Sequence, residues 1–302
     1  MHPLVTVVMA TYQGEKYLKI QIESLLAQDY PNLEFIWVDD ASTDQSLSIL
    51  KEYASQDVRI QILENLKNEG HNAAFERGMK VANGEYIALS DQDDYWVPSK
   101  ISTLVNGIGN YSLIYSDSQL IDQAGRELPL KMSGLKRQIA YNSPLMYTFG
   151  AWAPGHSMLF KKKVLETALP LSNWVTHDYL LGFSATCHKG IAYIPIPLVH
   201  YRQHESNAIG ADFKNAKKLY QTRSERNMRI CERIKILADR CQDSKEKQLF
   251  EQLYLDFSGN SLFNRMRRCK TVLKYRDDML AYKGKSSLGN FLYCFKLLFS
   301  IY

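Results

Sequence analysis

Several patterns are missing from this chain of 302 residues, and each absence bears on a class of protein. No stretch reaches the ~18 consecutive apolar residues that a membrane-spanning helix needs. The five cysteines are odd in number and none stands in a C-x-x-C pair, which disfavours both a disulfide framework and a zinc site. The N-terminal residues show no signal-peptide pattern. We therefore expect reduced thiols and a location in the cytoplasm.

Two common nucleotide-binding motifs are absent as well. The chain has no G-x-x-x-x-G-K-[ST], and the loop after its first apolar run reads Ala-Thr-Tyr-Gln-Gly instead of G-x-G-x-x-G. These absences disfavour P-loop proteins and dinucleotide-binding enzymes. The lack of a glycine- and basic-rich loop at this point also disfavours a nucleotidyltransferase. If a nucleotide binds, another group must neutralise its phosphates.

Short apolar runs alternate with amphipathic helical patterns through the first hundred residues. The runs cover residues 4–10, 33–38, 58–63 and 86–89. Such alternation predicts an α/β fold, in which helices flank a mostly parallel sheet and the crossovers are right-handed. We expect a nucleotide-binding half at about residues 1–97 and an acceptor half at about residues 98–210.

A cluster of carboxylates follows the last of these strands. Asp91, Asp93 and Asp94 fall within the segment SDQDDYW, and Asp91 and Asp93 point to the same side of an extended segment. Oxygen ligands at this spacing suit Mg²⁺ or Mn²⁺, which carboxylates and the phosphates of a substrate can hold together. A polar turn with solvated acids is the alternative. The position at the carboxyl end of a strand, where ligands bind in open α/β sheets, favours the metal site.

The charge of the chain is unevenly distributed. Residues 1–210 carry 17 Lys and Arg against 22 Asp and Glu, whereas residues 211–302 carry 20 against 10. We infer a catalytic domain over residues 1–210 and a basic, helical C-terminal region over residues 211–302. Basic amphipathic helices with an aromatic end suit an anionic membrane surface, and no nucleic-acid-binding motif is present. Packing on the catalytic body or on a second subunit, as in a homodimer, is the alternative.

Several segments carry a resemblance to a known family. ATYQGEKYL, VDDASTD, NEGHNAAFERGMKVANGEYIALSDQDD, HD and YRQH resemble the family-2 glycosyltransferases, in order and in spacing, over roughly residues 4–210. The resemblance implies a GT-A fold with a Rossmann-like sheet, followed here by a C-terminal helical extension. It also implies a nucleotide-diphosphate-sugar donor, a divalent metal ion (Mn²⁺ or Mg²⁺) and an inverting transfer.

The resemblance assigns roles to residues of the donor site. They are Thr11, Tyr12, Glu15, Asp40, Asp91 and Asp93. The first three are expected near the base, Asp40 is expected to bond it, Asp91 to approach the ribose and Asp93 to bind the metal ion. Gly70 either lets the backbone approach the donor or marks a turn. Arg202 and His204 lie in a segment that resembles a flap over the diphosphate, where Arg202 would pair a phosphate and His204 would reach the metal or a phosphate.

The predicted catalytic base is Asp178. This chain has His177-Asp178 where many relatives have Glu-Asp, and Asp178 would take the proton from an acceptor hydroxyl. A helix N-cap is the alternative role for this aspartate. We expect His177, together with Trp96, Trp152 and His156, on the acceptor side of the site.

The donor and the acceptor follow from the same resemblance. SDQDDYW and YRQHESN are similar to segments of rhamnosyltransferase-like members, so dTDP-rhamnose is the first expected donor, with UDP-sugars of galactosyl-, glucosyl- or N-acetylhexosaminyltransferases as alternatives. The Q-x-x-R-W segment of processive synthases is absent, so we expect one sugar per encounter. The expected acceptor is a lipid-linked cell-surface glycan, such as O-antigen or capsule, at the inner face of the bacterial cytoplasmic membrane. A catalytically silent sugar-nucleotide-binding module and a membrane scaffold are the alternatives from other classes.

Overall fold

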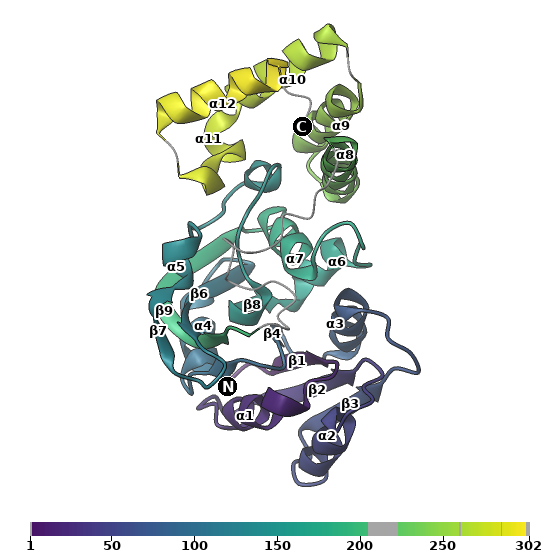
Figure 1. Ribbon diagram of the computed structural model, residues 1–302, viewed down its shortest axis with the longest axis vertical. Helices are drawn as coiled ribbons and strands as arrows, with labels where there is room; N and C mark the ends of the chain where they lie inside the picture. Colours follow the sequence, from purple (N-terminus) through teal and green to yellow (C-terminus); the bar gives the residue numbers. More distant parts are fainter. Residues whose placement is uncertain (1, 205–222, 260, 285, 300–302) are drawn as a thin grey trace.

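The computed structural model of the chain describes residues 2–204, 223–259, 261–284 and 286–299 (Figure 1). An α/β body occupies one end of the molecule, and the C-terminal helices occupy the other. Within the described residues, nine strands form one sheet in the order β3-β2-β1-β4-β8-β6-β9-β5, and β7 pairs with β6. The strands are β1 (Val5–Thr11), β2 (Leu33–Asp39), β3 (Ile60–Glu64), β4 (Tyr86–Ser90), β5 (Tyr95–Trp96), β6 (Leu113–Ile121), β7 (Glu127–Lys131), β8 (Met158–Lys161) and β9 (Ile191–Arg202).

The N-terminal part of the sheet is parallel, as the sequence predicts. β1 pairs in parallel with β2 and β4, and β2 pairs in parallel with β3. The connecting helices are α1 (Glu15–Leu26), α2 (Ser46–Ala54) and α3 (His71–Val81). The register places Thr11 beside Asp39 and Met9 beside Ser90. The loops that follow β1, β2 and β4 therefore emerge together at one edge of the sheet.

The second part of the sheet mixes strand directions. β8 is antiparallel to β4 and β6, whereas β6 is parallel to β9. The sequence predicts separate strands at residues 191–194 and 198–201, but the structure joins them in β9. The register between β6 and β9 shifts beside Asp117, which pairs with Pro197, and such irregularities accommodate prolines, which have no N–H to donate. The helices of this part are α4 (Lys100–Ile108), α5 (Met132–Leu135), α6 (Leu165–Ala168) and α7 (His177–Thr186).

Residues 131–148 are a packed segment. Their weak periodicity predicts a mobile loop on the acceptor side, whereas the structure gives the segment short helices, a β-bridge and buried side chains. Tyr141 and Tyr147 are buried, Tyr141 forms a β-bridge with Ile191, and Tyr147 ends a short 3₁₀ helix, η1 (Pro144–Tyr147). Isolated aromatic residues anchor the segment, and they leave no helical or strand periodicity in the sequence.

The C-terminal helices pack against the catalytic body. They are α8 (Arg223–Arg240), α9 (Ser244–Ser258), α10 (Leu262–Lys274), α11 (Arg276–Met279) and α12 (Ser287–Phe299). The ring centroids of Phe257 and Phe149 lie 5.7 Å apart, and Arg240 donates to the carbonyl oxygen of Leu169 at 2.8 Å. The predicted domain boundary between residues 210 and 211 lies outside the described residues. Among the helices described, none combines the length and the apolar character that crossing a bilayer requires.

Candidate active site

A cavity of about 650 Å³ opens at the edge of the sheet where β1, β2 and β4 end. One wall comes from the loops after these strands, and the facing wall comes from residues 152–156 and from the start of α7. The cavity is lined by ten of the predicted site residues: Thr11, Tyr12, Asp40, Gly70, Asp91, Asp93, Trp152, His156, His177 and Asp178. Segments that lie far apart in the sequence thus meet in one place.

The other four predicted site residues lie outside the lining of this cavity. The prediction that Trp96 contacts the acceptor is wrong, because its side chain is fully buried in the core below the acidic cluster. Glu15 accepts a hydrogen bond from the Gln45 backbone N–H at 2.9 Å, so it caps the start of α2. Arg202 and His204 lie against Asp93 and are described below.

Arg202 and His204 hold the segment that carries Asp93. The guanidinium of Arg202 is buried over the ring of Tyr17, and its Nε donates to the Asp93 carbonyl oxygen at 2.8 Å. The Nε2 of His204 lies 2.8 Å from a carboxylate oxygen of Asp93. In this structure, Arg202 therefore holds the backbone of Asp93 in place, whereas His204 lies where a second ligand to a metal at Asp93 would lie.

Side-chain amides tie the donor-side loops together. The Gln92 amide accepts a hydrogen bond from the Tyr12 N–H at 2.8 Å and donates to the Tyr12 carbonyl at 3.0 Å. The Gln13 amide accepts from the N–H groups of Thr43 and Asp44 at 2.9 and 3.1 Å. Neither glutamine is predicted from the sequence to be part of the site. Their partners lie about 30 residues (Gln13) and 80 residues (Gln92) away in the sequence, so no local pattern indicates these hydrogen bonds. The position of both glutamines inside the motifs is the only sign of their role.

Asp40 shapes the loop that precedes α3. Its carboxylate accepts from the Asn65 side chain at 2.6 Å and from the N–H groups of Glu69 and Gly70 at 2.9 and 2.8 Å. Gly70 has φ of 87°, a left-handed conformation that favours glycine, and it also lines the cavity. Asp40 and Gly70 thus form one unit of the donor-side wall, and Asp40 orients the backbone there.

The surroundings of the acidic cluster raise the pKa of two of its carboxyl groups, those of Asp91 and Asp94. The low-dielectric protein around Asp91, and then the charges of Asp93 and Asp178, raise its pKa to about 7. Burial, followed by repulsion from Asp93 and Asp91, raises the pKa of Asp94 well above its usual range. Asp94 is fully buried and accepts from the Arg202 backbone N–H at 3.0 Å. A bound cation would stabilise the charged forms of these acids.

Two sets of side chains could hold such a cation. In the first, Asp93 and His204 are already 2.8 Å apart, and Asp93 lines the cavity. In the second, one ligand atom each from Asp91, Asp94 and His156 lies within 4.8 Å of the others. The first set suits a metal that must also contact a substrate. In the second set, Asp94 is fully buried and accepts a hydrogen bond from the backbone of β9, so a metal held there would be less accessible to a substrate. The residues present therefore fit a divalent ion.

Lys100 lies below the acidic cluster and was missed by the sequence analysis. Its side chain is fully buried, its Nζ donates to the His156 carbonyl at 2.6 Å, and it sits over the ring of Trp96. Burial lowers the pKa of Lys100 well below its usual range, while Asp94 and Asp91 act in the opposite direction. The lysine offsets the charge of Asp94, which is fully buried, and of Asp91, which lines the cavity, and its bond holds the backbone of His156.

Substitution of Lys100 by methionine tests this role. Methionine removes the donor to the buried His156 carbonyl and the ammonium that faces Asp94 and Asp91, and we expect a loss of about 1–3 kcal/mol in the free energy of unfolding. Urea denaturation measures it, with Lys163→Met, at an exposed position, as the control. A loss below about 1 kcal/mol, the range of exposed ion pairs, would show that the acids do not depend on the lysine.

The facing wall carries Asp178 and His177 on the first turn of α7. Asp178 accepts from the hydroxyl of Thr176 and from the Tyr179 N–H at 2.7 Å. Thr176, not Asp178, occupies the N-cap position, so the alternative role of Asp178 as the N-cap is not met. The side chain of Asn72, on α3, accepts a hydrogen bond from the His177 N–H at 3.0 Å. This contact fixes the position of the start of α7 relative to α3.

The ring of His177 is enclosed by its neighbours. It lies 4.3 Å from the ring of Phe75 and 5.5 Å from that of His71, measured between centroids. A side chain at Gly155 would begin 2.7 Å from its Nε2, so this position needs the small residue found there. Burial lowers the pKa of His177 to about 4, which keeps the ring neutral near pH 7.

His156 lies on the same side of the cavity. Its Nε2 is 2.9 Å from the Ser118 hydroxyl, and its ring stacks on that of Tyr201 with the centroids 4.5 Å apart. Burial lowers its pKa to about 3. Two neutral imidazoles and Trp152 thus form an aromatic wall opposite the donor-side loops.

A mostly parallel sheet with a carboxylate cluster at its carboxyl edge, facing a separate aspartate across one cavity, defines a transferase of the GT-A class. The sequence profile described as "Glycosyl transferase family 2" matches residues 6–168. The chain belongs to glycosyl transferase family 2.

Three relatives show how far the similarity extends. EpsH of Bacillus subtilis (strain 168), named as a glycosyltransferase, is 27% identical over 230 residues, which are 73% of this chain and 66% of EpsH. The dTDP-rhamnosyl transferase RfbG of Shigella flexneri is 30% identical over 68% of this chain and 74% of RfbG. The UDP-Glc:alpha-D-GlcNAc-diphosphoundecaprenol beta-1,3-glucosyltransferase WfaP of Escherichia coli is 36% identical over 38% of this chain and 45% of WfaP. The match spans about two thirds or less of EpsH and WfaP.

Two solved structures share the fold. TarS 1-349 of S. aureus, in complex with UDP-GlcNAc, has a TM-score of 0.61 and 17% identity over 91% of this chain and 81% of that chain. The mannosyltransferase PcManGT of Pyrobaculum calidifontis, in complex with GDP-Man and Mn2+, has a TM-score of 0.56 and 16% identity over 100% of this chain and 81% of that chain. The expected GT-A fold is thereby confirmed.

Proposed function

We propose that this protein is an inverting, metal-dependent and non-processive glycosyltransferase that moves one sugar from a nucleotide-diphosphate-sugar to a lipid-linked glycan. The observation that carries the proposal is the meeting of Asp93 and Asp178 in one cavity, from opposite walls. A metal-binding acid on one side and a second carboxylate on the other are the groups that a direct sugar transfer needs.

Asp178 acts as the general base in this mechanism. Its carboxylate takes the proton of an acceptor hydroxyl as that oxygen forms a bond to the anomeric carbon of the donor sugar. The bond between the anomeric carbon and the diphosphate breaks at the same time, and its electron pair leaves with the nucleotide diphosphate. One displacement of this kind inverts the anomeric centre. Asn72 and Thr176 position the start of α7 and hence the base.

Asp93 and His204 would hold Mn²⁺ or Mg²⁺, with Asp91 beside them facing the ribose. The ion, when bound, stabilises the charge of the departing diphosphate as a Lewis acid. Arg202 holds Asp93 in place through the backbone. The presence of Mn2+ with GDP-Man in the related fold of PcManGT supports this assignment.

The donor of first choice is dTDP-rhamnose, and a UDP-sugar is the alternative. The likeness to the dTDP-rhamnosyl transferase RfbG extends over 68% of the chain and supports the first. The likeness to WfaP, whose name gives UDP-Glc, supports the second. Thymine and uracil share an imide N–H, and Asp40, which lines the cavity while it also holds the loop before α3, is the carboxylate proposed to accept it.

The acceptor is proposed to be a lipid-linked precursor of a surface glycan such as O-antigen or capsule. WfaP is named for a diphosphoundecaprenol acceptor, and the related names support the same class here. The enzyme would then work at the inner face of the bacterial cytoplasmic membrane as a peripheral protein.

Thermal unfolding with a panel of UDP-, dTDP- and GDP-sugars, with and without Mn²⁺, tests the proposal. A ligand that binds only the folded protein raises the melting temperature by mass action. We expect one class of nucleotide to raise it in a metal-dependent way, and the same donor to be consumed when a diphosphoundecaprenol-linked sugar is added. If no donor raises the melting temperature and none is consumed, the proposed function is overturned. Binding without consumption would instead indicate a silent binding module.

A further inference from the structure

The outer side of α12 exposes an apolar stripe. Leu288, Phe291, Leu292 and Phe295 follow the i, i+3, i+4, i+7 spacing of one helix face, and all four are exposed, Leu288 by 67% and Leu292 by 55%. A helix of a folded protein normally turns such a stripe toward the core. Here the buried side is formed instead by residues such as Cys294. α12 therefore carries apolar side chains on both sides, and the stripe from Leu288 to Phe295 is on its exposed side.

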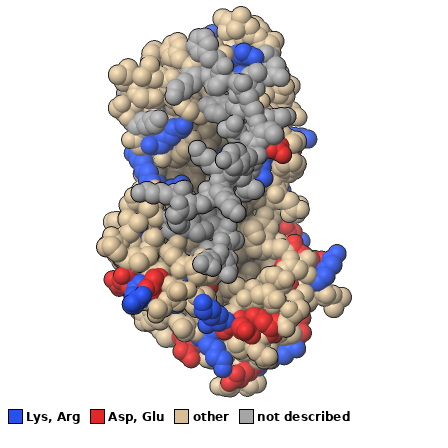
Figure 2. Space-filling model, viewed as in Figure 1, with Lys and Arg blue, Asp and Glu red and all other residues tan. Residues whose placement is uncertain are grey.

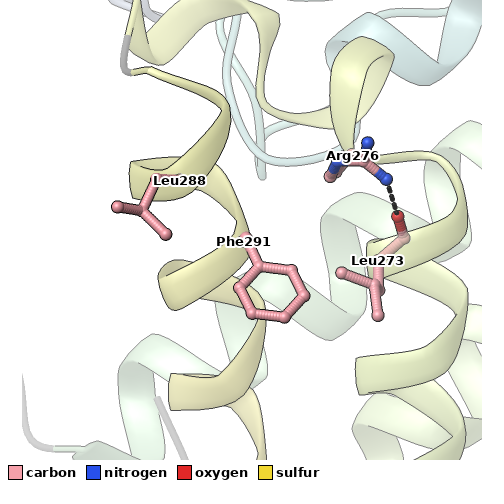
Figure 3. A pocket seen from close by; sticks show the side chains of 4 residues that line it. All are labelled: Leu273, Arg276, Leu288 and Phe291. Carbon is pink, nitrogen blue, oxygen red and sulfur yellow. Dashed lines mark hydrogen bonds between the residues drawn. The ribbon is translucent and has the colours of Figure 1, made fainter.

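α10 lies beside α12 and extends this apolar surface. Leu262, Phe263 and Met266 of α10 are exposed by 69%, 65% and 57%. The two helices pack on each other and leave a groove between them. Figure 3 shows Phe291 of α12 in this groove opposite Leu273 of α10, with Arg276 at one end. We call this surface of α10 and α12 the α10–α12 face.

Positive charge accompanies the apolar side chains. The α10 segment contains five Lys and Arg and no Asp or Glu, and the α12 segment contains no acid. Lys270 and Lys274 are exposed and follow Met266 at intervals of four residues, so they share its side of α10. On the face shown in Figure 2, acidic side chains gather over the end of the molecule opposite these helices. The α10–α12 face is therefore both apolar and positive.

The position of this face relative to the catalytic site follows from the packing. α11 contacts η1, and Tyr147 of η1 lies 5.2 Å from Tyr179, measured between ring centroids, on the helix that carries Asp178. The C-terminal helices therefore adjoin the acceptor side of the body. The nucleotide-binding half of the sheet lies at the far end (Figure 1).

We propose that the α10–α12 face docks on the surface of an anionic lipid bilayer. Leu288, Phe291 and Leu292 enter the boundary between headgroups and acyl chains, and Lys270 and Lys274 pair with lipid phosphates. This inference rests on the proposed function, because docking would bring the acceptor side of the site to a lipid-linked acceptor. An exposed apolar stripe with lysines beside it is typical of helices that lie in the interface of a membrane.

A second copy of the chain fits this face less well. In a two-fold dimer the same patch meets itself, so Lys270 and Lys274 of one copy would approach the lysines of the other. Like charges across an interface disfavour association. A bilayer that contains anionic lipids supplies the opposite charge together with an apolar phase.

Co-sedimentation of the purified full chain with vesicles tests the proposal. We compare vesicles of phosphatidylcholine alone with vesicles of phosphatidylcholine and phosphatidylglycerol in a 3:1 ratio. We expect strong binding only to the anionic vesicles and weaker binding as salt is added, because salt screens exposed charges. Binding to neither kind of vesicle overturns the proposal.

Paired variants separate the two contributions. Phe291→Ser with Leu292→Ser, and separately Lys270→Glu with Lys274→Glu, are each expected to lower the partition coefficient by about tenfold or more. The matched controls are Ile20→Ser with Val58→Ser, exposed apolar residues of the body, and Lys163→Glu with Lys189→Glu, exposed lysines of the body. Binding of the test variants equal to that of the controls overturns the proposal.

Two further readouts keep the outcomes distinct. Light scattering reports the oligomeric state, and a wild-type dimer that the α10–α12 variants dissociate, without vesicle binding, would show a subunit interface and overturn the lipid assignment. The shift in melting temperature caused by a nucleotide sugar is measured in every variant. If that shift persists while vesicle binding is lost, the variants are folded and the docking face is supported. If the wild type binds anionic vesicles but no nucleotide sugar, the proposed function fails and the docking surface stands.

Discussion

Replacing Asp178 by asparagine is expected to lower the rate constant of sugar transfer by about 10²–10⁴-fold, the range that a general base contributes. Asparagine has nearly the same shape and can still accept from the Tyr179 N–H, but it cannot take a proton. The affinity for the donor is expected to stay close to that of the wild type, because the donor-side wall is unchanged. Steady-state kinetics with a lipid-linked acceptor and donor titration by calorimetry measure the two quantities.

The control for this variant is Asp57→Asn, at a half-buried aspartate that pairs with Arg59 before β3 and lies outside the cavity lining. It carries the same chemical change outside the cavity and is expected to leave transfer unchanged. A variant at Asp178 that transfers sugar at the wild-type rate would remove this residue from the reaction. The base would then have to be sought among the other groups that line the cavity.

The second large effect is expected for Asp93→Ala. The variant loses the carboxylate that faces both the cavity and His204, so the rise in melting temperature caused by Mn²⁺ with a nucleotide sugar should disappear. Loss of residues that only support metal ligands typically costs about 10–100-fold in metal affinity, and we expect at least the upper end of that range here. Treatment of the wild type with a chelator should produce the same loss of donor binding.

Asp29→Ala, at an exposed acid after α1, is the control for this substitution. His156→Ala supplies the discriminating comparison, because His156 belongs only to the second ligand set. If Mn²⁺ binding survives Asp93→Ala and is lost in His156→Ala, the metal lies among Asp91, Asp94 and His156. The assignment of Asp93 would then be wrong.

The sequence predicts the donor side of the fold well because that side obeys local rules. Apolar runs separated by helical patterns require a parallel sheet, and the carboxyl ends of parallel strands meet at one edge. Thr11 ends β1, and Asp40 and Asp91 directly follow β2 and β4, so their convergence needs no knowledge of packing. Asp178 was placed by the resemblance to a family, and the structure brings it to the same cavity.

Other features depend on contacts that local sequence does not encode. Trp96 belongs to the two-residue strand β5, which pairs with β9 more than a hundred residues later, and this pairing turns the indole into the core. Lys100 contacts the His156 carbonyl across 56 residues, and Asn72 contacts His177 across 105. Polar residues in such pairs look like ordinary surface residues until the tertiary fold is known.

The amide bridges of Gln13 and Gln92 have a consequence for how a donor is chosen. They join the three donor-side loops into one preformed wall, so a nucleotide loses little binding free energy in ordering them. The choice of base would then depend on how well the base fits a pocket whose shape is set before the ligand binds. In the opposite wall Gly155 and His177 are in close contact, so any residue larger than glycine at position 155 would displace the His177 ring and change the shape of the cavity.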